Sequence, residues 1–218
     1  MLFDGDPVRV IGSVDVDKIE ELRSTIFEKF NSHWVKRTFK LMDSSYCLKA
    51  ITPSKFDVLD EQIAKELREM LLPWVEPYVS KNEKIVYLDV SSLPPGAQSL
   101  PHIDYSYIHI LAKRIRIPLV TNPKSTFSLV TANGIKTFNL KVGSVYETNN
   151  MVAHVAGNLG NSERWHIVAD ILDNSLYEYL ERTGKLADKA IDPSINFLLN
   201  KTVAGQLVES LKNESINI

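Results

Sequence analysis

The spacing of apolar residues is helical near the N-terminus of the chain and changes to a strand spacing further on. Four apolar residues recur at helical spacing in the first part: Ile19, Leu22, Ile26 and Phe30. They predict a helix over residues 18–30 that presents one apolar face to a sheet. Asp17, with Glu20 three residues later, is the expected start of this helix. Residues 8–14, just before it, predict a short edge strand.

A second helix is predicted over residues 58–72, again from a single apolar stripe. The stripe consists of Leu59, Ile63, Leu67, Met70 and Leu71. Pro73 is expected to close this helix, because proline lacks a backbone N–H and its ring clashes with the preceding turn. The role of the helix is expected to be structural.

From residue 84 onward the sequence consists of short runs of β-branched and aromatic residues, separated by Pro, Gly and Asn. The runs cover residues 85–91, 114–121, 126–131, 135–140, 144–148, 151–155 and 164–172. Asn133-Gly134 is a strong signal for a two-residue hairpin turn. Short strands without intervening helices favour a double-stranded β-helix, the jelly-roll or cupin-like fold, over an α/β sheet.

After Asp173 the helical spacing returns. Ser175 and Glu178 are expected to form a capping box, and a further helix is expected to begin at Asp192-Pro193. The last helix carries a narrow apolar stripe: Leu199, Val203, Leu207 and Leu211. We expect this stripe to cover the outer sheet, and a dimer contact is the alternative.

These patterns predict one mainly β domain over residues 1–218, with flanking helices. Its expected parts are a helical N-terminal part (15–80), a jelly-roll core (84–172) and C-terminal helices (174–213). A chain of 218 residues suits this arrangement, because single domains commonly have roughly 100 to 200 residues and β-rich ones run longer.

Composition narrows the set of partners. The net charge of −2 gives no electrostatic argument for binding nucleic acid or an anionic membrane. The acidic N-terminus lacks the apolar segment of a signal peptide, and no apolar run is long enough to span a membrane. Cys47 is the single cysteine, which excludes an internal disulfide and a cysteine-based zinc site. We therefore expect a cytoplasmic protein, monomeric or weakly dimeric.

Three residues have the chemistry and spacing of metal ligands. His102 and Asp104 lie two positions apart, so on an extended strand their side chains point to the same face. His154 is a third candidate. Two His and one carboxylate form the facial set that leaves open positions on a non-haem Fe(II), whereas a fourth protein ligand would close a structural site. Taken singly, His102 and Asp104 can equally form a surface pair, and His154 can equally be a core histidine.

Three arginines lie on predicted strands near these candidates. Arg114 and Arg116 alternate with isoleucines and share one face, and Arg164 follows His154 by ten residues. The guanidinium fork matches a carboxylate, so the three arginines are candidates for holding an organic acid. Surface ion pairs are the alternative, because the pattern alone does not say which face is buried. His166 shares the face of Arg164 and is either part of this site or a buried hydrogen-bonding residue.

The sequence resembles Fe(II)/2-oxoglutarate dioxygenases of the aspartyl/asparaginyl β-hydroxylase-like family over residues 88–172. The matching motifs are L-x-P-G, H-x-D, R-x-x-I-P-L, H-x-x-x-N and R-x-H-x-x-x-D. The resemblance implies that His102, Asp104 and His154 bind iron and that Arg164 pairs with the distal carboxylate of 2-oxoglutarate. Arg114 then occupies the first clamp position of the family. Two residues later the family often has His, and this chain has Arg116.

The same resemblance implies the reaction and its partners. 2-Oxoglutarate and O₂ would be co-substrates, and an amino-acid side chain, Asp or Asn in a peptide or protein, would be hydroxylated. A free amino acid or another residue type is also consistent with the sequence. Two other interpretations remain open: a non-catalytic jelly-roll module that binds an acidic ligand, and a metal-dependent cupin enzyme that does not use 2-oxoglutarate. His109 has no spacing argument and is expected to be structural.

Overall fold

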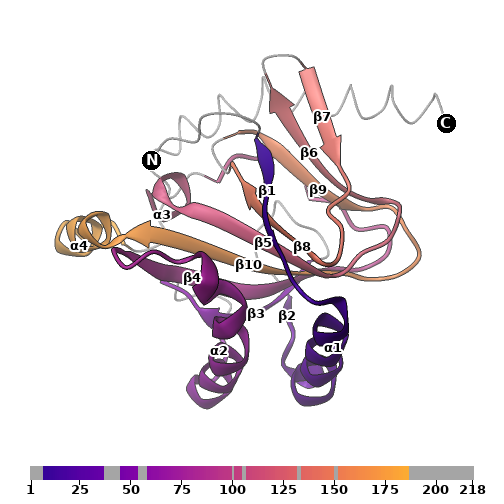
Figure 1. The fold of residues 1–218 in the computed structure, drawn as a ribbon, viewed down its shortest axis with the longest axis horizontal. Helices are drawn as coiled ribbons and strands as arrows, with labels where there is room; N and C mark the ends of the chain where they lie inside the picture. Colours follow the sequence, from indigo (N-terminus) through magenta and orange to yellow (C-terminus); the bar gives the residue numbers. More distant parts are fainter. Residues whose placement is uncertain are drawn as a thin grey trace.

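Two antiparallel sheets lie face to face in the computed structural model, and helices cover one outer side (Figure 1). The structure describes residues 7–36, 45–53, 58–99, 101–104, 107–131, 134–149 and 152–186. The helix expected from Asp192 lies outside these residues. Among the helices that are described, none has the length and apolar character needed to cross a membrane.

The larger sheet has seven strands and the smaller sheet has three. Across the larger sheet the order is β1 (Val8–Ser13), β8 (Ser144–Thr148), β5 (Lys113–Val120), β10 (Arg164–Asp173), β4 (Glu83–Leu93), β3 (Tyr46–Ile51) and β2 (Val35–Lys36). The smaller sheet contains β7 (Gly134–Phe138), β6 (Ser125–Thr131) and β9 (His154–Asn158). This is the expected double-stranded β-helix, and the expected edge strand is β1.

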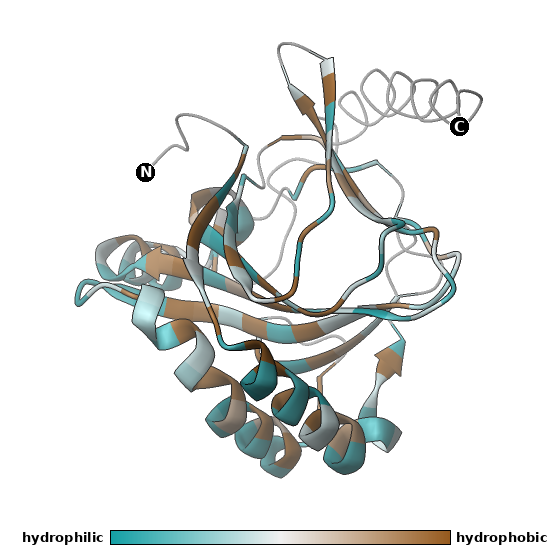
Figure 2. Cartoon of the chain, turned by 45° about the vertical axis from the view of Figure 1, so that its right-hand side comes forward, coloured by the Kyte–Doolittle hydropathy of each residue, from teal (hydrophilic) through white to brown (hydrophobic). Residues whose placement is uncertain are grey.

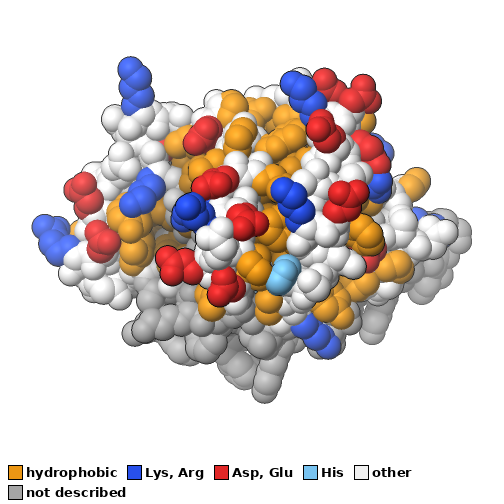
Figure 3. All heavy atoms as spheres, turned by 90° about the horizontal axis from the view of Figure 1, so that it is seen from below, with side chains coloured by type: hydrophobic (Ala, Val, Ile, Leu, Met, Phe, Trp, Pro, Cys, Tyr) orange, Lys and Arg blue, Asp and Glu red, His pale blue; other side chains and the backbone are white. Residues whose placement is uncertain are grey.

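Helices α1 (Val16–Phe30) and α2 (Glu61–Val75) pack on the outer face of the larger sheet (Figures 1 and 2). The four apolar residues that predict α1 are all buried there. They join a core that includes residues from three central strands: Leu88, Val90, Ile115, Ile117, Ile167 and Ala169. Figure 3 views this helical side from solvent, where charged side chains are interspersed with apolar ones.

Aspartate side chains set the starts of three helices. Asp15 accepts a hydrogen bond from the backbone of Asp17 and caps α1. Asp60 caps α2 in the same way, and Asp173 caps α4 (Asn174–Arg182). The expected starts at Asp17 and Ser175 are therefore wrong, because an aspartate two positions earlier in each case supplies the oxygen that accepts the orphan backbone N–H.

Proline does not close α2 where the sequence analysis expects it. Pro73 lies inside the last turn of the helix, which continues to Val75 and then tightens into a 3₁₀ turn, Glu76–Tyr78. Pro73 has no N–H to donate to the preceding turn, and the α-helical geometry ends two residues later, at Val75. The helix also begins at Glu61, later than expected.

The strand predictions are confirmed, with shifts at their ends. β9 begins at His154 rather than at residue 151, because its pairing with β6 starts where His154 faces Leu129. The hairpin of β6 and β7 is confirmed by the pairing of Thr131 with Gly134. Gly134 has a φ of +100°, in the left-handed region that favours glycine. A short helix, α3 (Tyr107–Leu111), was not expected.

The inner face of the larger sheet is polar and faces the smaller sheet. On β10 the residues from Trp165 to Ile171 that pack against the helices alternate with residues on the opposite face. The register places Val168 between Asp89 of β4 and Arg116 of β5. Charged side chains from neighbouring strands are thereby collected on one buried surface. These include Asp89, Arg114, Arg116, Arg164 and Asp170.

Candidate functional site

His102 and His154 are held side by side by the backbone. They face each other in an isolated antiparallel bridge, and each backbone N–H donates to the other residue's carbonyl, at 3.1 Å from His102 and 2.9 Å from His154. Directly opposite residues in an antiparallel pair project their side chains to the same side. The two imidazole centroids are 4.4 Å apart, and both residues are buried.

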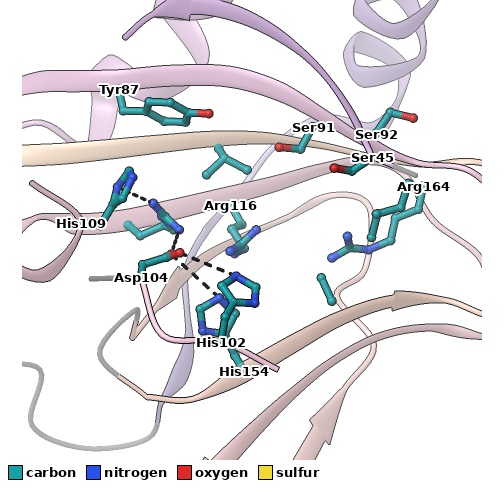
Figure 4. Close-up of a pocket in the computed structure, with 14 residues that line it drawn as sticks. Ser45, Tyr87, Ser91, Ser92, His102, Asp104, His109, Arg116, His154 and Arg164 are labelled. Carbon is teal, nitrogen blue, oxygen red and sulfur yellow. Dashed lines mark hydrogen bonds and ion pairs between the residues drawn. The ribbon is translucent and has the colours of Figure 1, made fainter. Parts of the chain in front are cut away.

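Asp104 completes a cluster with the two imidazoles (Figure 4). Its Oδ1 lies 3.7 Å from His102 Nε2, and its Oδ2 lies 3.9 Å from His154 Nε2. One ligand atom from each residue lies within 4.8 Å of the others. Within the described part of the chain, no other group of three His, Cys, Asp or Glu side chains is arranged closely enough to hold a metal ion.

The protonation of this cluster suits metal binding. His154 Nδ1 lies 2.9 Å from the Val152 carbonyl, so Nδ1 carries the proton and the Nε2 lone pair is directed toward Asp104. Burial, reinforced by His102, lowers the pKa of His154 to about 3, which keeps this imidazole neutral. Burial opposes ionisation of Asp104, but Arg114 and the nearby histidines outweigh it and hold the pKa of Asp104 well below its usual range. His154 therefore offers a neutral imidazole and Asp104 an ionised carboxylate, two of the groups that a facial triad needs.

Arg114 is engaged by two carboxylates. Its Nε and Nη2 donate to the two oxygens of Asp170 at 2.6 and 2.7 Å, and its Nη1 donates to Asp104 Oδ2. His109 Nδ1 lies 2.6 Å from Asp170 and 2.9 Å from Arg114 Nη2. Although burial lowers it, Asp170 and Asp104 together raise the pKa of Arg114 above its usual value. Arg114, which the sequence resemblance places at the first clamp position, thus links Asp104 to the buried carboxylate of Asp170.

Arg116 and Arg164 line the same cavity, and neither forms an ion pair with a carboxylate of the described residues. Arg116 Nε donates to Thr148 Oγ1 at 3.3 Å, and its guanidinium carbon lies 4.7 Å from the centroid of the Phe127 ring. Arg164 Nη2 donates to His166 Nδ1 at 3.4 Å. Figure 4 shows Arg116 beside the histidines and Arg164 further along the cavity.

The electrostatics of these two arginines indicate an anion site. Burial and then repulsion from Arg114 lower the pKa of Arg116 to about 10. Burial and then repulsion from Arg116 lower the pKa of Arg164 to about 9. Both groups remain cationic at neutral pH, and each is destabilised by its buried surroundings. A bound anion would offset the free-energy cost of burying these two cations.

His166 lies on β10, two residues after Arg164. Burial, followed by the charges of Arg164 and Arg116, lowers its pKa well below the usual range, so the imidazole is neutral. Its Nδ1 accepts from Arg164, which leaves the proton on Nε2. Nε2 is buried and has no hydrogen-bond partner among the described residues. Arg164 and Val168 lie on the same face of β10 as His166, and both line the cavity, so this face is the cavity side of the strand.

All predicted site residues except His166 line one cavity of about 110 Å³: His102, Asp104, Arg114, Arg116, His154 and Arg164. Hydroxyl-bearing residues complete its wall, among them Ser45, Tyr87 and Ser91. The Tyr87 hydroxyl donates to the buried Asp89 at 2.6 Å. The cavity is thus polar, and it lies where the two sheets face each other.

Two residues that structure the site were not assigned to it from the sequence. Asp170 lies in the R-x-H-x-x-x-D motif, and its place in an apolar strand on the face of Arg164 is a signal, because a buried carboxylate needs a cationic partner. His109 was expected to be structural, yet it lines the cavity and contacts both Asp170 and Arg114. No spacing signal identifies His109, since it comes from the unexpected helix α3.

No model of a known protein family matches the sequence, and no curated protein matches it. The fold is similar to that of a prolyl hydroxylase from Trichoplax adhaerens in complex with a hypoxia inducible factor peptide. The TM-score is 0.56 at 12% identity, covering 79% of this chain and 88% of that chain. It is also similar to HygX from Streptomyces hygroscopicus with nickel and 2-oxoglutarate bound. The TM-score is 0.55 at 13% identity, with 78% and 84% covered.

A third solved structure of similar fold is SnoK, a non-haem α-ketoglutarate-dependent carbocyclase from nogalamycin biosynthesis. The TM-score is 0.57 at 13% identity, covering 77% of this chain and 79% of that chain. At such low identity these similarities concern the fold, and they confirm the double-stranded β-helix. The finer resemblance to aspartyl/asparaginyl β-hydroxylase-like enzymes stays a prediction.

Proposed function

We propose that this protein is an Fe(II)- and 2-oxoglutarate-dependent dioxygenase. One observation carries the proposal: a cluster of two His and one Asp shares a buried cavity with two guanidinium groups that pair with no described carboxylate. A metal with open positions beside concentrated positive charge suits a chelating dicarboxylic acid. Of the three solved structures of similar fold described above, HygX and SnoK have names that refer to 2-oxoglutarate or α-ketoglutarate.

His102, Asp104 and His154 would hold the iron. Bound Fe(II) would supply the activation of O₂, coupled to the oxidative decarboxylation of 2-oxoglutarate to succinate and the hydroxylation of a substrate C–H bond. The protein supplies placement and charge. The backbone bridge fixes the two imidazoles, and the Val152 carbonyl fixes the tautomer of His154.

Arg164, whose side chain is buried, would bind the distal carboxylate of 2-oxoglutarate through its planar fork. His166 accepts from Arg164 and would help to hold the fork in position. Arg116, close to the triad, would be the second cation for the co-substrate. The sequence resemblance gave this position to Arg114, but Arg114 already makes three contacts with Asp104 and Asp170.

The proposed substrate is an amino-acid side chain, Asp or Asn in a peptide or protein. The motif resemblance supports this choice, and one structure of similar fold contains a bound peptide. Neither nucleic acid nor a membrane is a proposed partner. The single-domain organisation, the cytoplasmic location and the monomeric or weakly dimeric state stay predictions.

The test is the formation of succinate from 2-oxoglutarate by purified protein with Fe(II), a reductant and O₂. We expect wild-type turnover, strong loss in His154→Ala and Arg164→Ala, and normal turnover in Arg23→Ala, a matched change on the outer helix α1. Incubation with Asp- and Asn-containing peptides should add one oxygen atom, seen by mass spectrometry. Binding of 2-oxoglutarate without turnover would favour the non-catalytic module, and metal-dependent oxidation without 2-oxoglutarate would favour the cupin alternative.

A further inference from the structure

We infer that Arg114 is a positioning residue for Asp104 and that Asp170 holds Arg114 in place for this task. The inference rests on the proposed metal site, and it assigns Arg114 to the metal rather than to the co-substrate. Two of its nitrogens bind Asp170, and a third binds Asp104. The fork that a co-substrate carboxylate would need is therefore taken by protein carboxylates.

The three candidate ligands are held in place by different means. His102 and His154 are fixed by the backbone bridge between them. Asp104 lies outside the named strands, just after the bridge residue. Among the described residues, its carboxylate contacts the two imidazoles and Arg114. Arg114 is thus the group that directs this carboxylate toward the histidines.

Arg114 itself is rigidly placed. It lies directly opposite Asp170 in the pairing of β5 with β10, and the two side chains form a bidentate pair. Asp170 is fully buried, and His109 contacts it from α3. A guanidinium held at two points has little freedom to move its third nitrogen, so Asp104 receives a fixed donor.

The arrangement has two consequences for a metal ion. Arg114 binds Asp104 Oδ2, while Oδ1 lies 3.7 Å from His102 Nε2, so Oδ1 stays available for coordination through a single oxygen. Coordination through one oxygen leaves more positions open on the metal than coordination through both. Asp170 also neutralises the charge of Arg114, which would otherwise repel a divalent cation nearby.

Calorimetric titration of Mn(II), and then of 2-oxoglutarate into Mn(II)-saturated protein, separates the two possible roles. We expect Arg114→Gln to weaken Mn(II) binding by about ten-fold or more, because residues that orient metal ligands typically contribute 10- to 100-fold. The affinity of Mn(II)-saturated Arg114→Gln for 2-oxoglutarate should differ from that of wild type by less than about three-fold. Arg114→Lys, which keeps the charge but loses the fork, should lie between wild type and Arg114→Gln.

Arg116→Gln is the matched control, since Arg116 lies two residues further along β5 and lines the same cavity. It should show the reverse pattern, with weakened 2-oxoglutarate binding and Mn(II) affinity close to wild type. If Arg114→Gln binds Mn(II) like wild type and loses 2-oxoglutarate binding, Arg114 is a co-substrate clamp and the inference is overturned.

A double-mutant cycle tests whether Arg114 acts through Asp104. A second variant serves if Arg114→Gln does not fold. In an Asp104→Glu background, which keeps a carboxylate but displaces it, Arg114→Gln should cause a smaller loss of Mn(II) affinity than in wild type, whereas an equal loss in both backgrounds contradicts the inference. If Arg114→Gln does not fold, Asp170→Asn should weaken Mn(II) binding while sparing 2-oxoglutarate binding, and the opposite result overturns the inference. Wild-type protein that binds no Mn(II) would instead overturn the proposed function, and with it this inference.

Discussion

His102 and His154 each accept a backbone hydrogen bond from the other, at 2.9 and 3.1 Å, although one lies before β5 and the other begins β9. The bridge joins a loop to the smaller sheet and places two imidazoles on the same side. Their geometry therefore depends on the backbone, so side-chain substitutions at either position can remove a ligand without removing the bridge.

We expect His102→Ala and His154→Ala each to abolish the binding of one Fe(II) or Mn(II) per chain while the protein stays folded. Each histidine supplies one of three protein ligands, and the backbone bridge does not need either imidazole. Metal content after dialysis, with circular dichroism as the folding control, checks this. Full metal binding by a protein carrying both substitutions would exclude this metal site.

We expect Arg164→Lys to raise the apparent Michaelis constant for 2-oxoglutarate by about ten-fold or more, with Mn(II) affinity unchanged. The charge remains, but the two parallel hydrogen bonds of the fork are lost, and charge-assisted bonds contribute roughly 1.5 to 3 kcal/mol. Arg164→Ala should be worse, because a carboxylate would be buried without a partner. Steady-state kinetics, with Arg23→Lys as a control on α1, is the measurement. Wild-type dependence on 2-oxoglutarate in Arg164→Ala would place the clamp elsewhere.

Asp170 should contribute a pH-dependent part of the stability. Burial opposes its ionisation, but Arg114 and His109 outweigh burial and lower the pKa of Asp170 to about 2. Because the folded-state pKa lies below the unfolded one, the stabilisation is present above about pH 4 and is lost as the pH falls toward 2. The lowered pKa corresponds to a contribution of roughly 2 kcal/mol to the unfolding free energy at neutral pH.

Urea unfolding of wild type and Asp170→Asn across this pH range measures the effect. We expect the difference in unfolding free energy to be largest above about pH 5 and to shrink on acidification. A difference that does not vary between pH 3 and pH 7 would contradict the lowered pKa.

The two faces of β10 should separate stability from metal binding. Ile167 is fully buried in the core beneath the helices, while its neighbour His166 faces the cavity side. We expect Ile167→Ala to lower the unfolding free energy by about 2 to 5 kcal/mol, the usual cost of a large buried cavity. Ile167 does not orient a metal ligand, and residues that do so typically contribute ten-fold or more to metal affinity. The Mn(II) affinity of the folded variant should therefore stay within about three-fold of wild type. Loss of metal affinity beyond that would show that the two faces are coupled.

Much of the fold follows from the sequence because periodicity reports directly on buried faces. The spacing of Ile19, Leu22, Ile26 and Phe30 identifies the buried face of α1, and the short strand runs identify the jelly roll. Helix ends were less predictable. At α1 and α4 more than one residue had capping chemistry, and which oxygen reaches the backbone depends on the path of the preceding chain.

The site was predictable as a set of residues but not as a set of partners. Alternation places Arg114 and Arg116 on one face of β5. It does not reveal that Arg114 contacts Asp170 on β10 whereas Arg116 contacts Thr148 on β8. Cross-strand register decides those contacts, and register depends on the whole sheet. The assignment of roles to the three arginines stays a prediction that the variants above test.

The most direct test of the account is whether 2-oxoglutarate binding requires the metal and Arg164 together. Calorimetry should show one 2-oxoglutarate site per chain in Mn(II)-loaded wild-type protein. We expect affinity to fall by about ten-fold or more when Mn(II) is removed, when His154 is replaced by Ala, or when Arg164 is replaced by Ala, because one acid would contact both groups. Equal 2-oxoglutarate affinity with and without Mn(II), or in wild type and Arg164→Ala, would contradict the claim that the His-Asp-His cluster and Arg164 form one site.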